Sequence, residues 1–306
     1  MGVIGIDTSN YTTSIAFFDG TGGENCSKLL PVKSGELGLR QSDAVFAHIK
    51  SLPELSGRLF SHVRDEIRAV GVSTRPRAVE GSYMPCFLVG LSHATLLSNA
   101  LHVPLVEVSH QQGHVAASLW SAGHLELMDA PHLAWHLSGG TTELLLVEPE
   151  GKLVKCTKIG GTTDISAGQL IDRTGQLLGL PFPSGKHLDA LSREAAGKDF
   201  FRVKCKDMTF SFSGMQNKVQ QYFEANGDPA ETAAYALRCV AYGVFHATQQ
   251  ALKAYPGLPV VFSGGVASNS LLRQVLEPLN PIFAQPQYST DNAMGVAVLA
   301  GRCTEV

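Results

Sequence analysis

Residues 3–18 read VIGIDTSNYTTSIAFF, and residues 133–147 read LAWHLSGGTTELLLV. Each stretch holds an apolar run, a turn of small hydroxyl or glycine residues, and a second apolar run. Short apolar runs bounded by turn residues predict two buried strands joined as a hairpin. Because this order occurs twice, the sequence predicts an internal duplication in which a β-hairpin opens each half.

Helical and strand-like patterns alternate after each hairpin. Helical spacing predicts helices at residues 40–66 (broken around Pro53), 87–101, 110–120, 167–178 and 230–254, and a last helix from Asp291. Strands are expected at residues 70–73, 104–108, 154–159 and 259–263. This alternation predicts an α/β protein of two similar domains. We place them at residues 1–108, joined by a returning helix at 291–306, and at residues 109–290.

The bulk composition fits a globular protein with two domains. The chain has 306 residues, of which 44% are hydrophobic, and this is ample for a large core. No apolar run approaches the ~18 residues that a membrane helix needs. The six cysteines are scattered without a C-x-x-C pair, a pattern typical of reduced thiols. We therefore expect a cytoplasmic protein with no membrane segment.

A net charge of −3 gives no sign of nucleic-acid binding by the protein as a whole. A local basic segment at 186–206 is the exception, and it includes Phe200 and Phe201. Four of its cations are candidates for contact with tRNA: Lys198, Arg202, Lys204 and Lys206. Mixed cations and aromatic rings can bind phosphates and stack bases. The alternative is a solvated surface with two aromatic anchors.

Three turns follow predicted strands, at residues 7–13, 138–142 and 263–267. Glycine lets backbone N–H groups approach a phosphate closely, and the hydroxyls of Ser9 and Thr141 add donors. Asp7 could hold a divalent cation or its waters. Each turn alone could be a plain hairpin. Together they match the phosphate and adenosine loops of the actin-like fold.

His110 and His114 are separated by one helical turn. Residues i and i+4 share a helix face, so both imidazoles could bind one metal ion, although an ordinary helix start is the alternative. The zinc-protease pattern H-E-x-x-H is absent because residue 111 is Gln. Asp291 is the best candidate for a third ligand. Two imidazoles and one carboxylate leave positions open for substrate oxygens.

Six motifs in this order resemble the TsaD family, formerly called O-sialoglycoprotein endopeptidases. They are Asp7-Thr8-Ser9, His110-x-x-x-His114, residues 137–142 (LSGGTT), residues 210–214 (FSFSG), residues 263–269 (SGGVASN) and Thr290-Asp291-Asn292. The resemblance covers nearly the whole chain. It implies duplicated domains of the actin-like, sugar-kinase and Hsp70 type (ribonuclease H-like) with a cleft between them.

The resemblance also implies an activity and a set of site residues. Members transfer a threonylcarbamoyl group from threonylcarbamoyl-adenylate to the adenosine beside the tRNA anticodon, and often work with a protein partner or as a dimer. His110, His114 and Asp291 would bind iron or zinc, and Asp7 and Ser138 would lie at the reacting group. Contacts to ATP or an adenylate would come from Ser9, Gly139, Gly140, Thr141, Asp172, Gly185, Gly265 and Asn269.

Several positions depart from the usual pattern of the family. The family has acids where this chain has Tyr11 and Thr12, His at Thr141, Glu at Gln169, and Gly-Pro-Gly at Arg75-Pro76-Arg77. This leaves two alternatives to the tRNA transferase: a carbamoyl-type transferase with another acceptor, and a non-catalytic nucleotide-binding partner in a complex. A peptidase is disfavoured because no Glu flanks the imidazole pair.

Overall fold

The structure is a computed structural model that describes residues 1–9, 11–31 and 39–305. Asn10, in the first predicted turn, and Val306, in the predicted last helix, lie outside the described residues. The chain forms two sheets with helices, and it separates into two compact units. Unit 1 comprises Met1–Ala130, Glu148–Cys156 and Asp291–Val306, and unit 2 comprises Pro131–Val147 and Thr157–Thr290.

The first sheet has the strand order β3-β2-β1-β4-β5. Its strands are β1 (Gly2–Asp7), β2 (Thr12–Phe18), β3 (Gly23–Leu29), β4 (Ile67–Arg75) and β5 (Leu105–Ser109). The predicted hairpin is present, because β2 runs antiparallel to β1 with Ile6 opposite Ile15. The strands β4 and β5 add in parallel on the other side of β1.

The second sheet repeats this plan in the order β11-β10-β6-β7-β8-β9. Its strands are β6 (His132–Leu137), β7 (Thr142–Glu150), β8 (Leu153–Thr162), β9 (Thr209–Phe210), β10 (Val260–Ser263) and β11 (Ile282–Phe283). A hairpin of β6 and β7 is again central, and β10 and β11 again add in parallel. The predicted duplication is therefore visible in the topology, with β9 as an additional edge strand.

Nine α-helices lie within the described residues. They are α1 (Gln41–His62), α2 (Phe87–Leu101), α3 (His110–Ala122), α4 (Ala167–Leu177), α5 (Gly185–Ser192), α6 (Ser213–Asn226), α7 (Pro229–Ala254), α8 (Ser270–Leu276) and α9 (Met294–Thr304). Short 3₁₀ turns occur at Leu125–Asp129, Gly265–Ser268 (η2), Glu277–Leu279 and Pro286–Tyr288. No described helix has the length and apolar character needed to cross a membrane.

Two helix predictions were wrong in their details. The predicted break at Pro53 does not occur, because α1 continues through it. Proline removes one hydrogen bond, but Leu52, Leu55 and Leu59 are buried in the core of unit 1 and hold the helix together. The last helix begins at Met294 rather than Asp291, so Asp291 lies in the loop before it.

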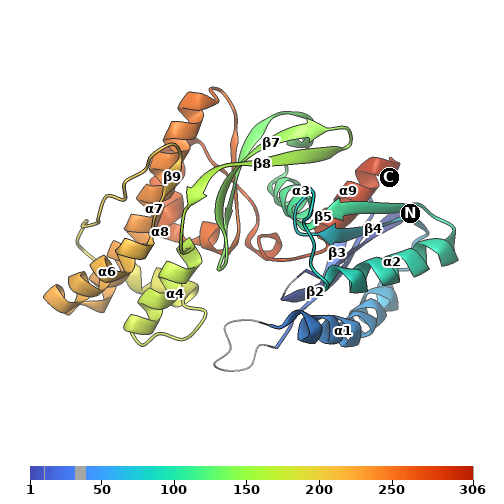
Figure 1. The fold of residues 1–306 in the computed structure, drawn as a ribbon, viewed down its shortest axis with the longest axis horizontal. Coiled ribbons are helices and arrows are strands. Elements are labelled where there is room, and N and C mark those ends of the chain that lie inside the picture. The colour runs from blue at the N-terminus through green and yellow to red at the C-terminus, as the bar shows by residue number, and fades with distance from the viewer. Residues whose placement is uncertain (10, 32–38, 306) are drawn as a thin grey trace. The chain divides into compact units, whose positions relative to one another are not determined.

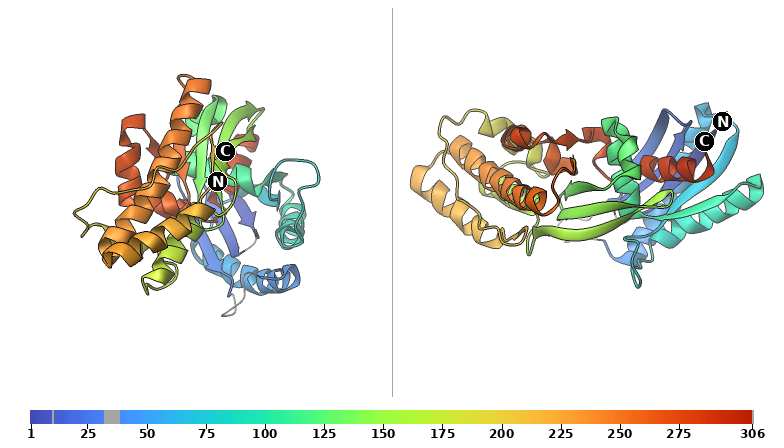
Figure 2. Two further views of the ribbon diagram at one scale, coloured as in Figure 1. Left: turned by 60° about the vertical axis from the view of Figure 1, so that its left-hand side comes forward. Right: turned by 90° about the horizontal axis from the view of Figure 1, so that it is seen from above.

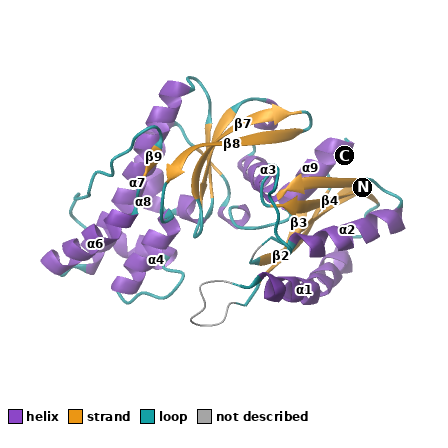
Figure 3. Cartoon of the chain, in the orientation of Figure 1, coloured by secondary structure: helices purple, strands orange, loops and turns teal. Residues whose placement is uncertain are grey.

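Helices cover both faces of the first sheet (Figures 1 and 3). Ile4 and Ile6 of β1 point into the core on the side of α1 and α2. On the opposite face, Gly5 and Gly71 let α9 approach closely, since a Cβ at Gly5 would lie 2.5 Å from the Ala293 carbonyl oxygen. The contact of α9 with β1 brings the two ends of the chain together in unit 1 (Figure 2).

The helices α3 and α9 cross at two glycines. A Cβ added at Gly295 would lie 1.8 Å from the carbonyl oxygen of Gly113, a distance that no side-chain motion can relieve. This contact explains why α3 belongs to unit 1, whereas the predicted boundary at residue 108 assigned it to the second domain. The crossing also fixes His114, beside Gly113, relative to the loop that carries Asp291.

Candidate metal and nucleotide sites

Three side chains of unit 1 form a group that could hold a metal ion. One ligand atom each from His110, His114 and Asp291 lies within 4.8 Å of the others. Asp291 Oδ1 is 3.1 Å from Nε2 of His114 and 3.5 Å from Nε2 of His110. The two imidazole rings are 4.3 Å apart between centroids. The donor set suits a divalent transition metal, because imidazole nitrogen and carboxylate oxygen are its common ligands.

The start of α3 fixes the first imidazole of this group. Ser109 caps the helix by accepting a hydrogen bond from the Gln112 backbone, and the Gln112 side chain accepts one from the Ser109 backbone in return. This reciprocal pair is the capping box. His110 is therefore the first residue of a well-defined helix, and His114 follows on the same face one turn later.

Asp7 lies behind the first imidazole. Its carboxylate is fully buried, and Oδ2 is 3.2 Å from Nδ1 of His110. Ser9 Oγ donates to the same oxygen at 2.7 Å, and Ser73 Oγ of β4 donates to Oδ1. The predicted residues Asp7 and Ser9 thus join this site in unit 1, and Ser73 is a member that sequence reasoning missed.

The charged forms of His110 and Asp291 stabilise each other. Burial opposes the imidazolium, but Asp7 and Asp291 outweigh it and raise the pKa of His110 to about 10. Burial likewise opposes ionisation of Asp291, yet hydrogen bonds from His110 and His114 hold its pKa well below the usual range. A divalent cation that binds here would compete with a proton for the His110 imidazole.

The predicted phosphate turn joins β6 to β7 in unit 2. Ser138 N donates to the Thr141 carbonyl at 2.8 Å, and Thr141 N donates to Ser138 Oγ at 3.1 Å. Gly139 and Gly140 at its tip are exposed, and a Cβ on either would meet open space. Their backbone is therefore accessible to a ligand, whereas the Ser138 hydroxyl closes the turn.

Helix α4 contacts the other predicted nucleotide elements of unit 2. Its Gly168 packs on Gly139, where a Cβ would lie 2.5 Å from the Gly139 Cα. Its Asp172 accepts a hydrogen bond from Ser184 N at 2.9 Å, just before α5, and burial raises the pKa of Asp172. It also contacts η2. Gly185 and Gly265, the first residues of α5 and η2, are exposed with open space around them.

Asn269 differs from these glycines because protein groups occupy its side chain. Its Nδ2 donates to Asp189 Oδ1 at 2.8 Å, and its Oδ1 accepts from Leu272 N at 2.9 Å. Asp189 Oδ1 also accepts from the backbone and hydroxyl of Ser270. Asn269 therefore caps α8, and Asp189, which sequence reasoning missed, links α5 to α8.

The FSFSG motif anchors a carboxylate at the start of α6. Asp164 accepts hydrogen bonds from Phe212 N at 2.8 Å and Ser213 N at 3.1 Å, and from the Ser211 hydroxyl. Burial opposes its charge, but these bonds lower the pKa of Asp164. The motif thus has a structural role, because Asp164 satisfies the N–H groups that open the helix.

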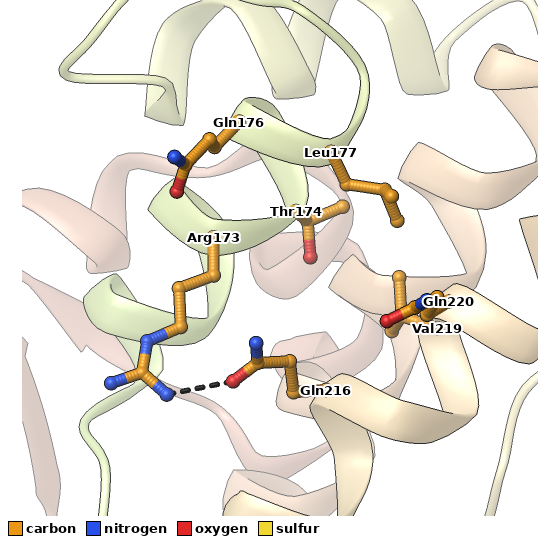
Figure 4. A pocket seen from close by; sticks show the side chains of 7 residues that line it. All are labelled: Arg173, Thr174, Gln176, Leu177, Gln216, Val219 and Gln220. Atoms are coloured by element: carbon orange, nitrogen blue, oxygen red, sulfur yellow. Dashed lines mark hydrogen bonds between the residues drawn. The ribbon is translucent and has the colours of Figure 1, made fainter.

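A pocket of about 200 Å³ lies between α4 and α6 (Figure 4). Arg173, one of its lining residues, donates to Gln216 Oε1 at 2.7 Å. The remaining lining residues are Thr174, Gln176, Leu177, Val219 and Gln220. None of the predicted site residues lines this pocket.

The first part of the predicted basic segment, residues 186–192, lies in α5, and the backbone of its second part is held on α7. We call residues 196–208 the strap. Glu231 accepts hydrogen bonds from Ala196 N at 2.8 Å and Gly197 N at 2.7 Å. Arg238 donates to the Gly197 carbonyl at 2.6 Å. The beginning of the strap is therefore held on α7 through its backbone N–H groups and through a backbone carbonyl.

The rest of the strap is held in the same way. Gln250 accepts from Met208 N at 2.8 Å and donates to the Cys205 carbonyl at 3.1 Å. The ring of Phe200 stacks on Tyr242, with centroids 4.2 Å apart. Since side chains from residue 231 to residue 250 of α7 contact it, the strap is fixed along its length without regular secondary structure.

The backbone of the strap is held on α7, but the cationic side chains of the strap are exposed to solvent. Lys198, Arg202, Lys204 and Lys206 are all exposed. No ion pair involves them within the residues that the structure describes. Phe201 is 40% exposed, and Nζ of Lys218 lies 5.6 Å from its ring centroid. The strap therefore presents unpaired cations beside a partly exposed aromatic ring.

Solved structures with a similar fold belong to proteins with several different activities. Component A of the (R)-2-hydroxyglutaryl-CoA dehydratase of Acidaminococcus fermentans matches with a TM-score of 0.60 and 15% identity, over 100% of both chains. A ROK family glucokinase from Streptomyces griseus matches with a TM-score of 0.54 and 11% identity, over 98% of this chain and 99% of that chain. These are actin-like proteins, so the predicted fold class is confirmed.

Sequence relatives are more specific. The tRNA N6-adenosine threonylcarbamoyltransferase of Carboxydothermus hydrogenoformans is 31% identical, covering 96% of this chain and 90% of its own length. The protein of that name from Thermosipho africanus is 30% identical, covering 97% and 92%. The model of the TsaD family, described as tRNA N6-adenosine threonylcarbamoyltransferase, matches residues 42–298. With the family model and full-length relatives in agreement, this chain belongs to the TsaD family.

Proposed function

We propose that this protein transfers the threonylcarbamoyl group of threonylcarbamoyl-adenylate to the adenosine beside the anticodon of a tRNA. The observation that carries the proposal is the convergence of His110, His114 and Asp291 within 4.8 Å in a chain of the TsaD family. A non-catalytic nucleotide-binding partner would have no need for this partly buried group of ionisable residues.

The three residues would hold an iron or zinc ion. When bound, the ion would stabilise negative charge that develops on the oxygens of the substrate. His110 and His114 supply neutral nitrogen ligands, and Asp291 supplies one negative charge. A set with a single carboxylate leaves the bound divalent ion with net positive charge, which favours an anionic substrate such as an adenylate.

The adenylate would bind to unit 2. Support comes from the exposed backbone at Gly139, Gly140, Gly185 and Gly265. Backbone N–H groups at glycine turns and at helix starts favour phosphate and ribose oxygens. Asp172 and Asn269 would act indirectly, because their side chains hold the segments that carry these glycines.

The test of this function is a reconstituted reaction. Purified protein would be mixed with threonine, bicarbonate, ATP, an adenylate-forming enzyme and unmodified tRNA, and the nucleosides analysed by mass spectrometry. We expect threonylcarbamoyl-adenosine to form. Consumption of the adenylate without tRNA would instead favour another acceptor, and adenylate binding without turnover in either assay would favour the non-catalytic partner.

We also propose that the strap contacts the tRNA backbone. Its four cations are exposed and unpaired, and its backbone is held on α7, so little ordering is needed when a phosphate binds. Replacing Arg202, Lys204 and Lys206 together with Gln should weaken tRNA binding. The slope of log K against log salt should become shallower by about 2–3, because each of the three lost phosphate contacts removes roughly 0.7–0.9.

A second triple variant controls for the change in net charge. Lys50, Lys155 and Lys253 are exposed and lie outside the strap, so their replacement with Gln should leave the salt slope unchanged. Binding would be measured by fluorescence anisotropy from 50 to 300 mM salt. Equal slopes for wild-type protein and the strap variant would show that the tRNA binds elsewhere.

A further inference from the structure

A layer of buried polar side chains lies behind the three proposed metal ligands. It consists of Asp7 at the end of β1, Ser9 in the turn that follows, and Ser73 on β4. All three are buried, and Asp7 and Ser73 have no exposed surface. An ionised carboxylate without contact with water is costly unless it is hydrogen-bonded. The partners of Asp7 therefore indicate its role.

Asp7 and Asp291 contact opposite nitrogens of one imidazole. Asp7 lies 3.2 Å from Nδ1 of His110, whereas Asp291 lies 3.5 Å from Nε2. A metal held by His110, His114 and Asp291 would bind Nε2, because His114 also faces Asp291 through its own Nε2. Asp7 thus faces the side of the ring away from the proposed metal.

A carboxylate at Nδ1 determines which tautomer the neutral ring adopts. When Nδ1–H donates to Asp7, the proton is kept on that nitrogen and the lone pair of Nε2 is free for a metal. The negative charge behind the ring also makes Nε2 a stronger donor, and the hydrogen bond fixes the ring plane. Asp7 can therefore act on a metal that it does not touch.

Ser73 and Ser9 hold the carboxylate in this position. Ser73 Oγ donates to Asp7 Oδ1, and Ser9 Oγ donates to Oδ2 at 2.7 Å, so both oxygens are bonded. Because β4 lies beside β1 in parallel, Ser73 is presented next to Asp7 by the strand pairing. The neighbouring strands β1 and β4 thus supply the carboxylate that faces Nδ1 of His110 and a hydroxyl that holds this carboxylate in place.

We propose that Asp7 and Ser73 are positioning residues for the metal ligand His110, and that Asp7 is not itself a ligand. This rests on the proposed metal site, but it does not depend on the acceptor or on the adenylate. Metal binding can be measured with the purified protein alone. A failure of this inference is therefore distinguishable from a failure of the proposed tRNA activity.

The experiment measures binding of Zn²⁺ by competition with a chromophoric chelator, and ligand number by X-ray absorption of the Zn²⁺-loaded protein. We expect Asp7→Asn to weaken Zn²⁺ binding by about 10–100-fold, the usual effect of losing such an outer partner, with nitrogen and oxygen ligand numbers unchanged. Ser73→Ala should weaken it by a smaller factor, and Ser73→Thr, which keeps the hydroxyl, should recover most of the affinity.

Ser14 provides a matched control. It is as buried as Ser73, but its hydroxyl donates to the backbone carbonyl of Asp7 rather than to the carboxylate. Ser14→Ala should bind Zn²⁺ with wild-type affinity even if its melting temperature falls. Wild-type affinity in Asp7→Asn would overturn the proposal, and so would the loss of one oxygen ligand, because Asp7 would then bind the metal directly.

Discussion

Replacement of His114 with alanine is expected to abolish both metal binding and transfer activity. The side chain is only 10% exposed and its Nε2 lies 3.1 Å from Asp291, so its removal takes away a nitrogen donor that faces the Asp291 carboxylate. Loss of an outer partner of a ligand usually costs 10–100-fold in affinity. Loss of one of the three proposed protein ligands should cost more than ~100-fold, and formation of the modified nucleoside should fall to background.

His124→Ala is the control for this variant. His124 is another imidazole of unit 1, is 43% exposed, and pairs with Glu126 at 2.8 Å on the surface. It should bind Zn²⁺ and form product at wild-type levels. Zn²⁺ affinity would be measured for both variants, and product formation in the reconstituted reaction. Wild-type affinity and turnover in His114→Ala would remove the metal from the proposed function.

Local pattern was sufficient to predict most of the fold. The helix predicted at 87–101 is α2 with the same bounds, because its apolar spacing is continuous. The sequence pattern did not predict the secondary structure correctly where a segment is polar or where tertiary packing overrides the intrinsic helix propensity. The strand β3 was missed because most of its residues are exposed, so it lacks an apolar run. The break expected at Pro53 was wrong because the buried leucines around it stabilise α1.

Local geometry predicted only part of the candidate site. The pairing of His110 with His114 follows from helix geometry alone, whereas Asp291 was named as the best candidate for a third ligand and the family resemblance then implied the same residue. The positions of Asp7 and Ser73 depend on the pairing of β1 with β4, which joins residues far apart in the chain. Likewise, Asn269 follows a glycine turn, which is where a nucleotide contact is expected. Its hydrogen bond to Asp189 joins residues far apart in the chain, so local sequence could not predict it.

Replacement of Gly295 with alanine is expected to destabilise the protein and to weaken metal binding at the same time. A Cβ there would lie 1.8 Å from the carbonyl oxygen of Gly113 and 2.7 Å from the backbone nitrogen of Ala117. Both are backbone atoms of α3, so the helices α3 and α9 must move apart. Overpacking of this kind costs ~1–3 kcal/mol and sometimes more, which lowers the melting temperature by several degrees.

The effect on the metal follows because His114 lies next to Gly113, and Asp291 precedes α9. Two variants isolate this cause. In Gly113→Ala the new Cβ would meet the Val296 side chain at 3.2 Å, so a small adjustment should suffice and the loss should be milder. In Gly57→Ala, within α1, the new Cβ meets open space, and the better helix propensity should stabilise the protein by up to ~1 kcal/mol. The three variants would be ranked by their melting temperatures from calorimetry and by their Zn²⁺ affinities from titration. A Gly295→Ala protein with wild-type stability and affinity would show that the crossing of α3 and α9 does not position the ligands.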